Sequence, residues 1–232
     1  MTPMIRWSKT FIVVLTVGRS GSTLLQGILN AIPGVLVRGE NNAFLSHLYR
    51  AHAALYEAKT EMGGKGSDTP QHPWFGAAEL RPDFLLSDIA SIVAKQLLAG
   101  ENPENYSAIG FKEIRWLRET NLHGYLKFLD QIFDDTRFIL LTRDINLILQ
   151  SGWWPKREPA AAREQIENFY HAAESAPVKK LFRIDYAQLV EDSARLVELF
   201  AFLGSACPAN LADLLAKPHS FGNRTRESAV FL

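Results

Sequence analysis

The chain has 232 residues, of which 47% are hydrophobic and 22% charged. This is the balance of an ordinary globular domain, and it excludes a disordered, collagen-like or coiled-coil chain. The 25 Lys and Arg residues equal the 25 Asp and Glu residues, so the formal net charge is zero. No overall field therefore attracts nucleic acid or an anionic membrane, and any anion site must be local.

Cys207 is the only cysteine, so the chain can form neither an intrachain disulfide nor a cysteine-based zinc cluster. This fits a reducing compartment, and we expect a cytoplasmic protein. The apolar run 11–15 is much shorter than the roughly 20 residues that a membrane-spanning helix needs. We expect a buried strand there, no membrane span, and a single domain over residues 1–232.

Apolar, β-rich runs alternate with helical patterns along the chain, as they do in βαβ units. The fold class expected is therefore α/β, with three layers and a mostly parallel central sheet. Strands are predicted at 10–16, 35–37, 108–112, 137–142 and 180–184. Helices are predicted directly after the first strand and at 43–58, 83–98, 122–133, 145–153, 160–173, 193–203 and 209–215.

The segment 61–82 interrupts this rhythm, since it is rich in Gly and Pro and contains Trp74 and Phe75. We expect a long surface loop. Loops of this length are commonly functional lids or disordered segments. A cover over a substrate site and a plain surface loop therefore both stay open.

The first predicted strand ends in the sequence Gly-Arg-Ser-Gly-Ser-Thr, residues 18–23, which leads directly into an amphipathic helix. Gly18 and Gly21 let the backbone bend and approach a ligand, while the N–H groups and dipole of the helix favour an anion. Ser22 or Thr23 can cap the helix and can also donate to an oxyanion. The segment is thus either a phosphate cradle or a tight turn with a serine cap.

Arg19 favours the phosphate cradle, because it places a cation beside the start of the helix. The Walker A motif is not matched, since Thr16 stands at its first glycine and Ser22 at its lysine. A nucleotide triphosphatase also needs an aspartate for magnesium. The candidate, Asp144, follows Arg143, whose charge opposes a cation.

A second polar pair lies further along the chain. Arg143 ends a predicted strand, and Ser151 follows eight residues later in the next predicted helix. Eight residues are just over two helical turns, so Ser151 projects near the face beneath Arg143. The two can clamp a second phosphate, with a bidentate contact from the arginine. Alternatively, Arg143 pairs with Asp144 or another acid, and Ser151 is an ordinary helix serine.

Taken together, these residues resemble the sulfotransferases that use 3′-phosphoadenosine 5′-phosphosulfate (PAPS). Residues 19–23 are similar to the loop that binds the 5′-phosphosulfate in that family, and Arg143 with Ser151 has the spacing of its 3′-phosphate pair. The resemblance runs from Gly18 to Gly204 and implies a P-loop NTPase-like fold, PAPS as donor and no metal. Further segments that are similar to landmarks of the family are 110–116, 185–189 and 199–204.

The sequence departs from the family at two places. Ile145 stands where the family usually has a proline that is pre-set for the first helical turn. The closing glycine-rich, basic loop has only a partial counterpart in 221–226, where Arg224 and Arg226 either contact phosphate or belong to a solvated tail. The cofactor contacts implied by the resemblance are Gly18, Arg19, Ser20, Gly21, Ser22, Thr23, Arg143, Ser151 and Arg224.

Sulfuryl transfer by in-line displacement needs charge stabilisation, alignment and a base. Arg19 would neutralise charge on the bridging oxygen and the sulfuryl group. Glu40 stands where the second strand ends and is predicted to be the base. In carbohydrate-directed members of the family a glutamate at a similar point has that role. Alternatively, Glu40 is a carboxylate at the start of a helix, where the helix dipole favours it. Lys112 would hold the acceptor or the sulfuryl group, or else pair with Glu113 or a neighbouring acid.

The six histidines show no spacing typical of a metal site, so no metal is expected. His47 and His52, in the helix predicted after Glu40, are reserve candidates for the base. Trp153 and Trp154 are candidates for the wall of the acceptor pocket or for the core.

The sequence therefore predicts an enzyme that moves a sulfuryl group from PAPS to an acceptor hydroxyl. The acceptor is expected to be a small molecule or glycan, carbohydrate-like because a glutamate rather than a histidine stands at the base position. No nucleic-acid partner is expected. The alternatives are a P-loop kinase and a non-catalytic adenosine-phosphate-binding module that has both phosphate sites but no base.

Overall fold

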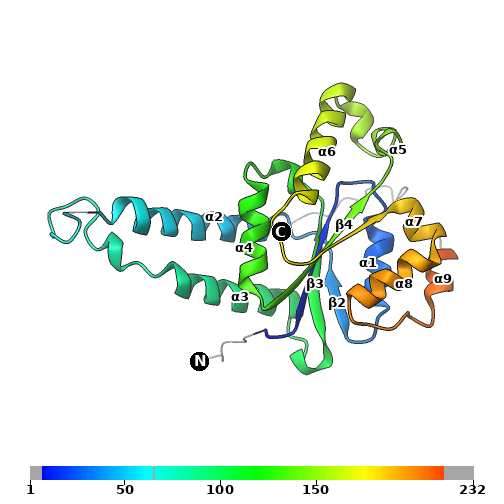
Figure 1. The fold of residues 1–232 in the computed structure, drawn as a ribbon, viewed down its shortest axis with the longest axis horizontal. Helices are drawn as coiled ribbons and strands as arrows, with labels where there is room; N and C mark the ends of the chain where they lie inside the picture. The colour runs from blue at the N-terminus through cyan, green and yellow to red at the C-terminus, as the bar shows by residue number, and fades with distance from the viewer. Residues whose placement is uncertain (1–6, 65, 217–232) are drawn as a thin grey trace, which may run out of the picture.

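The centre of the protein is a sheet of five parallel strands in the order β2-β3-β1-β4-β5. The computed structural model describes residues 7–64 and 66–216. Helices cover both faces of the sheet (Figure 1), which confirms the α/β class predicted from the alternating pattern. The strands are β1 (Thr10–Leu15), β2 (Val35–Arg38), β3 (Ala108–Glu113), β4 (Asp135–Thr142) and β5 (Leu181–Asp185).

Nine α-helices and several shorter helical turns accompany these strands within the described residues. The α-helices are α1 (Ser22–Asn30), α2 (Phe44–Glu57), α3 (Pro82–Leu98), α4 (Leu122–Ile132), α5 (Ile145–Leu149), α6 (Pro159–Glu174), α7 (Tyr186–Glu191), α8 (Ser193–Phe202) and α9 (Leu211–Ala216). The turns are η1 (Ala58–Met62), η2 (Ala77–Glu79), η3 (Pro103–Asn105), η4 (Arg115–Arg118) and η5 (Trp154–Lys156). Across the part of the chain that is described, no helix combines the length and apolar character needed to cross a membrane.

The central strand β1 is buried on both faces. Phe11, Val13 and Leu15 belong to a hydrophobic cluster that includes residues of α3, α4 and α6. The alternate residues Ile12 and Val14 belong to a second cluster with residues of α1 and α8. Because successive strand residues point to opposite faces, a strand covered on both sides has to be apolar throughout. The predicted buried strand in this run is confirmed.

All five strands are parallel, so their carboxyl ends lie at one edge of the sheet. The loops that follow β1, β2, β3 and β4 therefore gather at that edge. In open parallel sheets of this kind, ligands bind outside the carboxyl ends of the strands. The predicted site residues on these loops are accordingly brought into one region.

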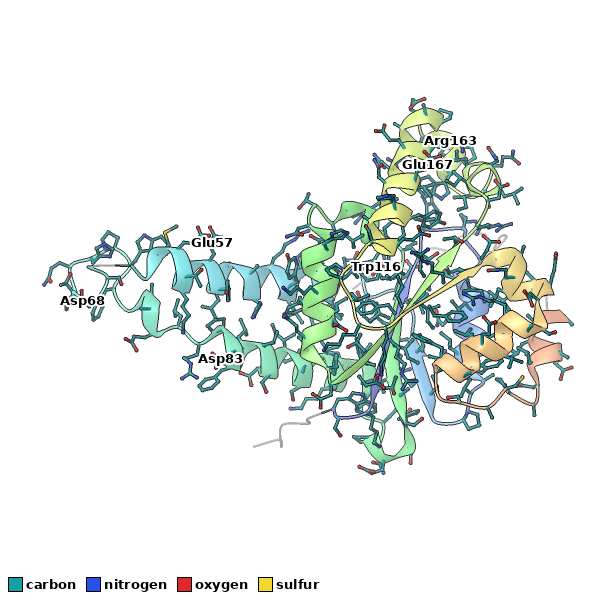
Figure 2. All side chains as sticks on the ribbon, viewed as in Figure 1. Glu57, Asp68, Asp83, Trp116, Arg163 and Glu167 are labelled. Atoms are coloured by element: carbon teal, nitrogen blue, oxygen red, sulfur yellow. The ribbon has the colours of Figure 1, made fainter. Side chains whose placement is uncertain are left out.

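Helices α2 and α3 form a hairpin that projects from the body of the protein, with the segment 61–82 at its outer end (Figure 1). Figure 2 shows Glu57, Asp68 and Asp83 along this arm, whereas Trp116 lies within the body. The segment includes part of η1 and all of η2. It lies away from the carboxyl edge of the sheet, so a plain surface loop describes it better than a cover over a substrate site.

The structure differs from the predicted elements at two places. The helix predicted at 145–153 ends at Leu149, and Gly152 adopts a positive φ of 64°. The cause is a tertiary contact, because the Trp154 indole Nε1 donates to the carbonyl of Gly18 at 3.0 Å and draws the chain back to the β1–α1 loop. The short helix α7 was not predicted; Asp185 and Gln188 form a capping box at its start.

The glycine at position 110 is required by the packing of β3 against β1. Its partner across the strands is Ile12, and a Cβ at residue 110 would lie 2.0 Å from the Ile12 carbonyl oxygen. We expect Gly110→Ala to lower the free energy of unfolding by about 1–3 kcal/mol, measured by urea denaturation. Gly27→Ala is the matched control, since a Cβ there meets nothing within 4 Å and helix α1 should gain about 0.5–1 kcal/mol. Equal stability of Gly110→Ala and wild type would contradict the register of β1 and β3.

Candidate functional site

The loop between β1 and α1 is held in a fixed conformation by buried polar contacts. The Thr16 hydroxyl is hydrogen-bonded to Ser20 Oγ at 2.6 Å and to the Leu141 carbonyl of β4 at 2.9 Å. Ser20 is fully buried. Arg19 adopts a positive φ of 73°, which is uncommon for a residue with a side chain and is typical of functional loops.

Helix α1 begins without a side-chain cap. Its N-cap residue is Gly21, in the left-handed region with φ 90°, and no side chain accepts a hydrogen bond from the first turn. The expectation that Ser22 or Thr23 caps the helix is therefore wrong: Ser22 is buried inside the first turn and Thr23 is exposed. The first N–H groups of a helix have no partner within it. At α1 the N–H of Leu24 donates to the Gly21 carbonyl at 2.9 Å. The N–H groups of Ser22 and Thr23 have no such partner among the described residues, so these two are available to an anion.

Both glycines of this loop lie against aromatic rings. A Cβ on Gly18 would be 2.3 Å from the Trp153 ring, and a Cβ on Gly21 would be 2.2 Å from the Tyr186 ring. Trp154 adds the hydrogen bond to the Gly18 carbonyl. The sequence pattern explained the glycines by the approach of a ligand; the structure shows that close packing of distant aromatic residues also requires them.

Arg143 and Ser151 both contact the β1–α1 loop at one residue. Arg19 Nε donates to Ser151 Oγ at 2.8 Å. Arg143 Nη1 donates to the carbonyl of Arg19 at 3.0 Å. The structure thus brings together the two segments that the sequence singled out separately.

The surroundings of Arg143 bear on the predicted alternative that it pairs with Asp144. Its guanidinium lies 4.5 Å from the centre of the Tyr186 ring, and its Nε is buried with no hydrogen-bond partner among the described residues. Asp144 is occupied elsewhere, because it accepts from Asn146 N–H at the start of α5 at 2.7 Å. Arg143 is therefore not paired with Asp144, and it holds donors that a ligand can use.

Glu40 lies between two cations at the end of β2. Lys112 Nζ donates to its Oε1 at 2.9 Å, and Arg115 Nη1 donates to its Oε2 at 3.1 Å. The Lys112 side chain is buried, whereas that of Glu40 is 32% exposed. Lys112 thus pairs with Glu40 rather than with Glu113. Glu40 also precedes the Ala43 N-cap of α2 by three residues, so it is not a carboxylate of the first helical turn.

Sequence reasoning missed the organising role of Glu113. This buried carboxylate accepts hydrogen bonds from the backbone N–H groups of Asn41, Ala43, Ile114 and Arg115, at 3.3, 2.9, 2.8 and 3.1 Å. The Arg115 side chain donates to it as well, at 2.9 Å. Glu113 therefore fixes the loop that carries Glu40. The signal was its place directly after Lys112 at the end of a buried strand.

A cleft of about 590 Å³ opens beside these residues. It is lined by Gly18 of the β1–α1 loop, by Glu40 and by Trp153. Trp154 also lines it but is 3% exposed and belongs to the core, whereas Trp153 is 48% exposed. The cleft therefore joins the β1–α1 loop to Glu40, the one carboxylate among its described lining residues.

The two reserve histidines lie outside this cleft. His47 lines an adjoining cleft of about 290 Å³ together with Arg50. The His52 ring packs 5.5 Å from the Phe128 ring, and burial lowers the pKa of His52. Neither is placed beside Glu40.

Two other predictions concern phosphate contacts from the end of the chain and the binding of metal ions. The segment 221–226, with Arg224 and Arg226, lies outside the described residues. Within residues 7–64 and 66–216, no group of three His, Cys, Asp or Glu side chains is arranged to hold a metal ion.

Comparison with known proteins identifies the family of the chain. Residues 12–207 match the model of the sulfotransferase family. The chain therefore belongs to the sulfotransferase family, a class of enzymes that transfer sulfuryl groups.

Solved structures show the same fold. The sulfotransferase domain from the Synechococcus PCC 7002 olefin synthase is similar with a TM-score of 0.59 and 18% identity, over 94% of this chain and 82% of that domain. The sulfotransferase domain from the curacin biosynthetic pathway is similar with a TM-score of 0.50 and 19% identity, over 93% of this chain and 80% of that domain. No curated protein matches the sequence significantly.

The hydrogen bonds to Glu113 give folding a dependence on pH. Burial alone would raise the pKa of Glu113, but the N–H groups of Ala43 and Ile114 and the Arg115 guanidinium outweigh it and hold the pKa below its ordinary value of 4.5. In the unfolded chain the carboxyl titrates near that ordinary value. Its stabilisation is therefore complete above pH 4.5 and is lost as the pH falls through the lower folded pKa.

We expect Glu113→Gln to lower the free energy of unfolding at pH 7 by about 1.5–3 kcal/mol, because a charged acceptor is lost. The difference from wild type should shrink as the pH is lowered below the ordinary pKa. Urea denaturation at pH 7 and at successively lower pH measures both. Glu101→Gln, at an exposed loop position, is the control. A difference that does not change with pH would show that the charge of Glu113 is not the source.

Proposed function

We propose that the protein transfers the sulfuryl group of PAPS to the hydroxyl group of an acceptor. The observation that supports this most is the meeting of Arg143 and Ser151 at Arg19, residues that are 124 and 132 positions apart from it. PAPS carries a 5′-phosphosulfate and a 3′-phosphate on one ribose. A protein that binds both needs two adjoining anion sites, and these contacts bring the two candidate sites together.

The residues present fit this donor. The uncapped start of α1 offers backbone N–H groups to the phosphosulfate. Arg143 has a buried Nε without a partner among the described residues, so it has a donor to spare for the 3′-phosphate. Ser151 accepts from Arg19, which leaves its own hydroxyl hydrogen free for the same phosphate. We assign Arg19, in the same loop, the neutralisation of charge on the leaving oxygen.

The donor supplies an activated sulfuryl group. The acceptor oxygen forms a bond to sulfur while the bond from sulfur to the bridging phosphate oxygen breaks, and the electron pair leaves with adenosine 3′,5′-bisphosphate. Glu40 takes the proton of the acceptor hydroxyl. Lys112 and Arg115 each use one lone pair of its carboxylate, which has about four. We therefore assign Lys112 and Arg115 the positioning of Glu40, with acceptor capacity left for the proton.

We also propose that the acceptor is a carbohydrate or a related alcohol that enters the cleft beside Glu40. Trp153 supports this, since its indole is half exposed in the cleft wall. An aromatic face of this kind is suited to stacking on a sugar ring. The position of Trp153 on Gly18 would place a stacked ring next to the donor loop.

Nucleotide binding tests the donor site. Adenosine 3′,5′-bisphosphate should bind on the order of 100-fold more tightly than AMP, because only the former reaches Arg143 and Ser151 with its 3′-phosphate. Arg143→Ala should remove most of this difference in calorimetric titrations. Arg183→Ala is the control, since that side chain is exposed and pairs with Glu174. Equal affinity of the wild type for the two nucleotides would refute the 3′-phosphate site.

Turnover tests the base. Glu40→Gln keeps the size of the side chain but cannot take a proton, so kcat should fall by roughly 10²–10⁴-fold while the affinity for adenosine bisphosphate changes little. The measurement is initial-rate kinetics at saturating acceptor, with chemistry shown to limit the rate. The substitution also removes the anionic partner of the buried Lys112. Urea denaturation of Glu40→Gln should therefore accompany the kinetics, to show that the variant is folded. The control is Glu101→Gln, and a fall below about threefold would remove Glu40 from this role.

A further inference from the structure

We propose that the acceptor carries a negative charge besides its hydroxyl group, and that Arg118 and Arg157 bind this charge. The inference rests on the proposed function, because it takes the cleft beside Glu40 as the acceptor site. It narrows the acceptor from a neutral alcohol to a hydroxyl-bearing carboxylate or phosphate.

The charges around the cleft are unbalanced. Among the described residues that line it, three are arginines, Arg115, Arg118 and Arg157, and only Glu40 is acidic. Arg115 is already engaged, since it donates to both Glu40 and Glu113. Among the described residues, neither Arg118 nor Arg157 forms an ion pair.

These two cations come from separate parts of the chain. Arg118 is the last residue of η4, which follows β3, and Arg157 directly follows η5. The cleft is therefore where the β3 and β4 sides of the sheet each contribute a guanidinium. Glu40 does not cancel them, because Lys112 and Arg115 already offset its charge and that of Glu113.

Arg157 is held in position before any ligand binds. Its Nη2 donates to Gln165 Oε1 of α6 at 2.8 Å, and its guanidinium lies 5.3 Å from the centre of the Trp154 ring. Gln165 and Trp154 line the same cleft. A guanidinium has five N–H donors, so the others stay available. A side chain that is already ordered loses less entropy when it binds, which favours recognition of an anion here.

A charged acceptor would form ion pairs with Arg118 and Arg157 that a neutral acceptor cannot form. Carboxylates and phosphates form charge-assisted and often bidentate hydrogen bonds with arginine. A neutral sugar of the same shape would leave both guanidinium groups to water. The competing assignment is that Arg118 and Arg157 bind the donor, and the experiment has to separate these two.

Matched pairs of acceptors test the inference: glucuronate with glucose, N-acetylglucosamine 6-phosphate with N-acetylglucosamine, and 3-hydroxybutyrate with its methyl ester. The enzyme is first saturated with adenosine bisphosphate, and each probe is then titrated into that complex by calorimetry. We expect the charged member of at least one pair to bind 10-fold or more tightly than its neutral partner, and to lose this advantage at high salt. The pair that shows it distinguishes a carboxylate from a phosphate.

The double variant Arg118→Gln and Arg157→Gln should abolish that preference, raising KM for the charged acceptor at least 10-fold in the transfer assay. Its affinity for adenosine bisphosphate should stay unchanged. The control is Arg163→Gln on the same helix as Gln165. Its side chain pairs with Glu167 and is not among the residues that line the cleft, and Figure 2 shows both residues on α6.

Three results would overturn the inference. The first is that no charged probe binds the complex. The second is that the charged and neutral members of every pair bind equally. The third is that the double variant loses affinity for adenosine bisphosphate, which would assign both arginines to the donor. Failure of the proposed function is recognised separately, because the wild type would then not bind adenosine bisphosphate in the first titration.

Discussion

The site depends on one contact, the hydrogen bond between the Arg143 guanidinium and the backbone carbonyl of Arg19. It joins the loops that follow two neighbouring strands, β1 and β4, and it fixes a residue whose backbone is in an uncommon conformation. The side chain of Arg19 then reaches Ser151. The left-handed conformation of Arg19 costs free energy, and this contact helps to offset that cost together with the buried hydrogen bonds of Thr16 in the same loop. The fold stabilises the loop in advance of any ligand.

A second network sets the other half of the site. Buried carboxylates are tolerated only when they are fully hydrogen-bonded and paired. Glu113 meets that condition through four backbone donors and Arg115, and the same arginine extends to Glu40. The buried carboxylate of Glu113 thus helps to position the partly exposed carboxylate of Glu40. Sequence reasoning found Glu40 and Lys112 as candidates but not this arrangement, because two of the backbone donors, Asn41 and Ala43, lie some seventy residues earlier in the chain.

The class of fold was predictable because strand-length apolar runs alternate with helical patterns, and the run of β1 is apolar throughout, as in a strand buried on both faces. The local details that failed were decided by distant residues. Ser22 or Thr23 was expected to cap α1, yet Gly21 takes that position, with the ring of Tyr186 packed against it. A helix was expected to continue past residue 149, yet it ends because Trp154 bonds to Gly18. Neither contact leaves a mark in the local periodicity from which helices are predicted.

The packing of Trp153 on Gly18 gives the two halves of the site a common wall. One side of the indole touches the β1–α1 loop, and the same residue lines the cleft beside Glu40. A ligand that shifts this loop therefore moves the wall of the cleft, and a ligand in the cleft presses on the loop. Two binding equilibria that share a movable part are thermodynamically linked, and such linkage is reciprocal. By this reasoning the order in which the two substrates arrive changes the path of assembly but not the coupling between them.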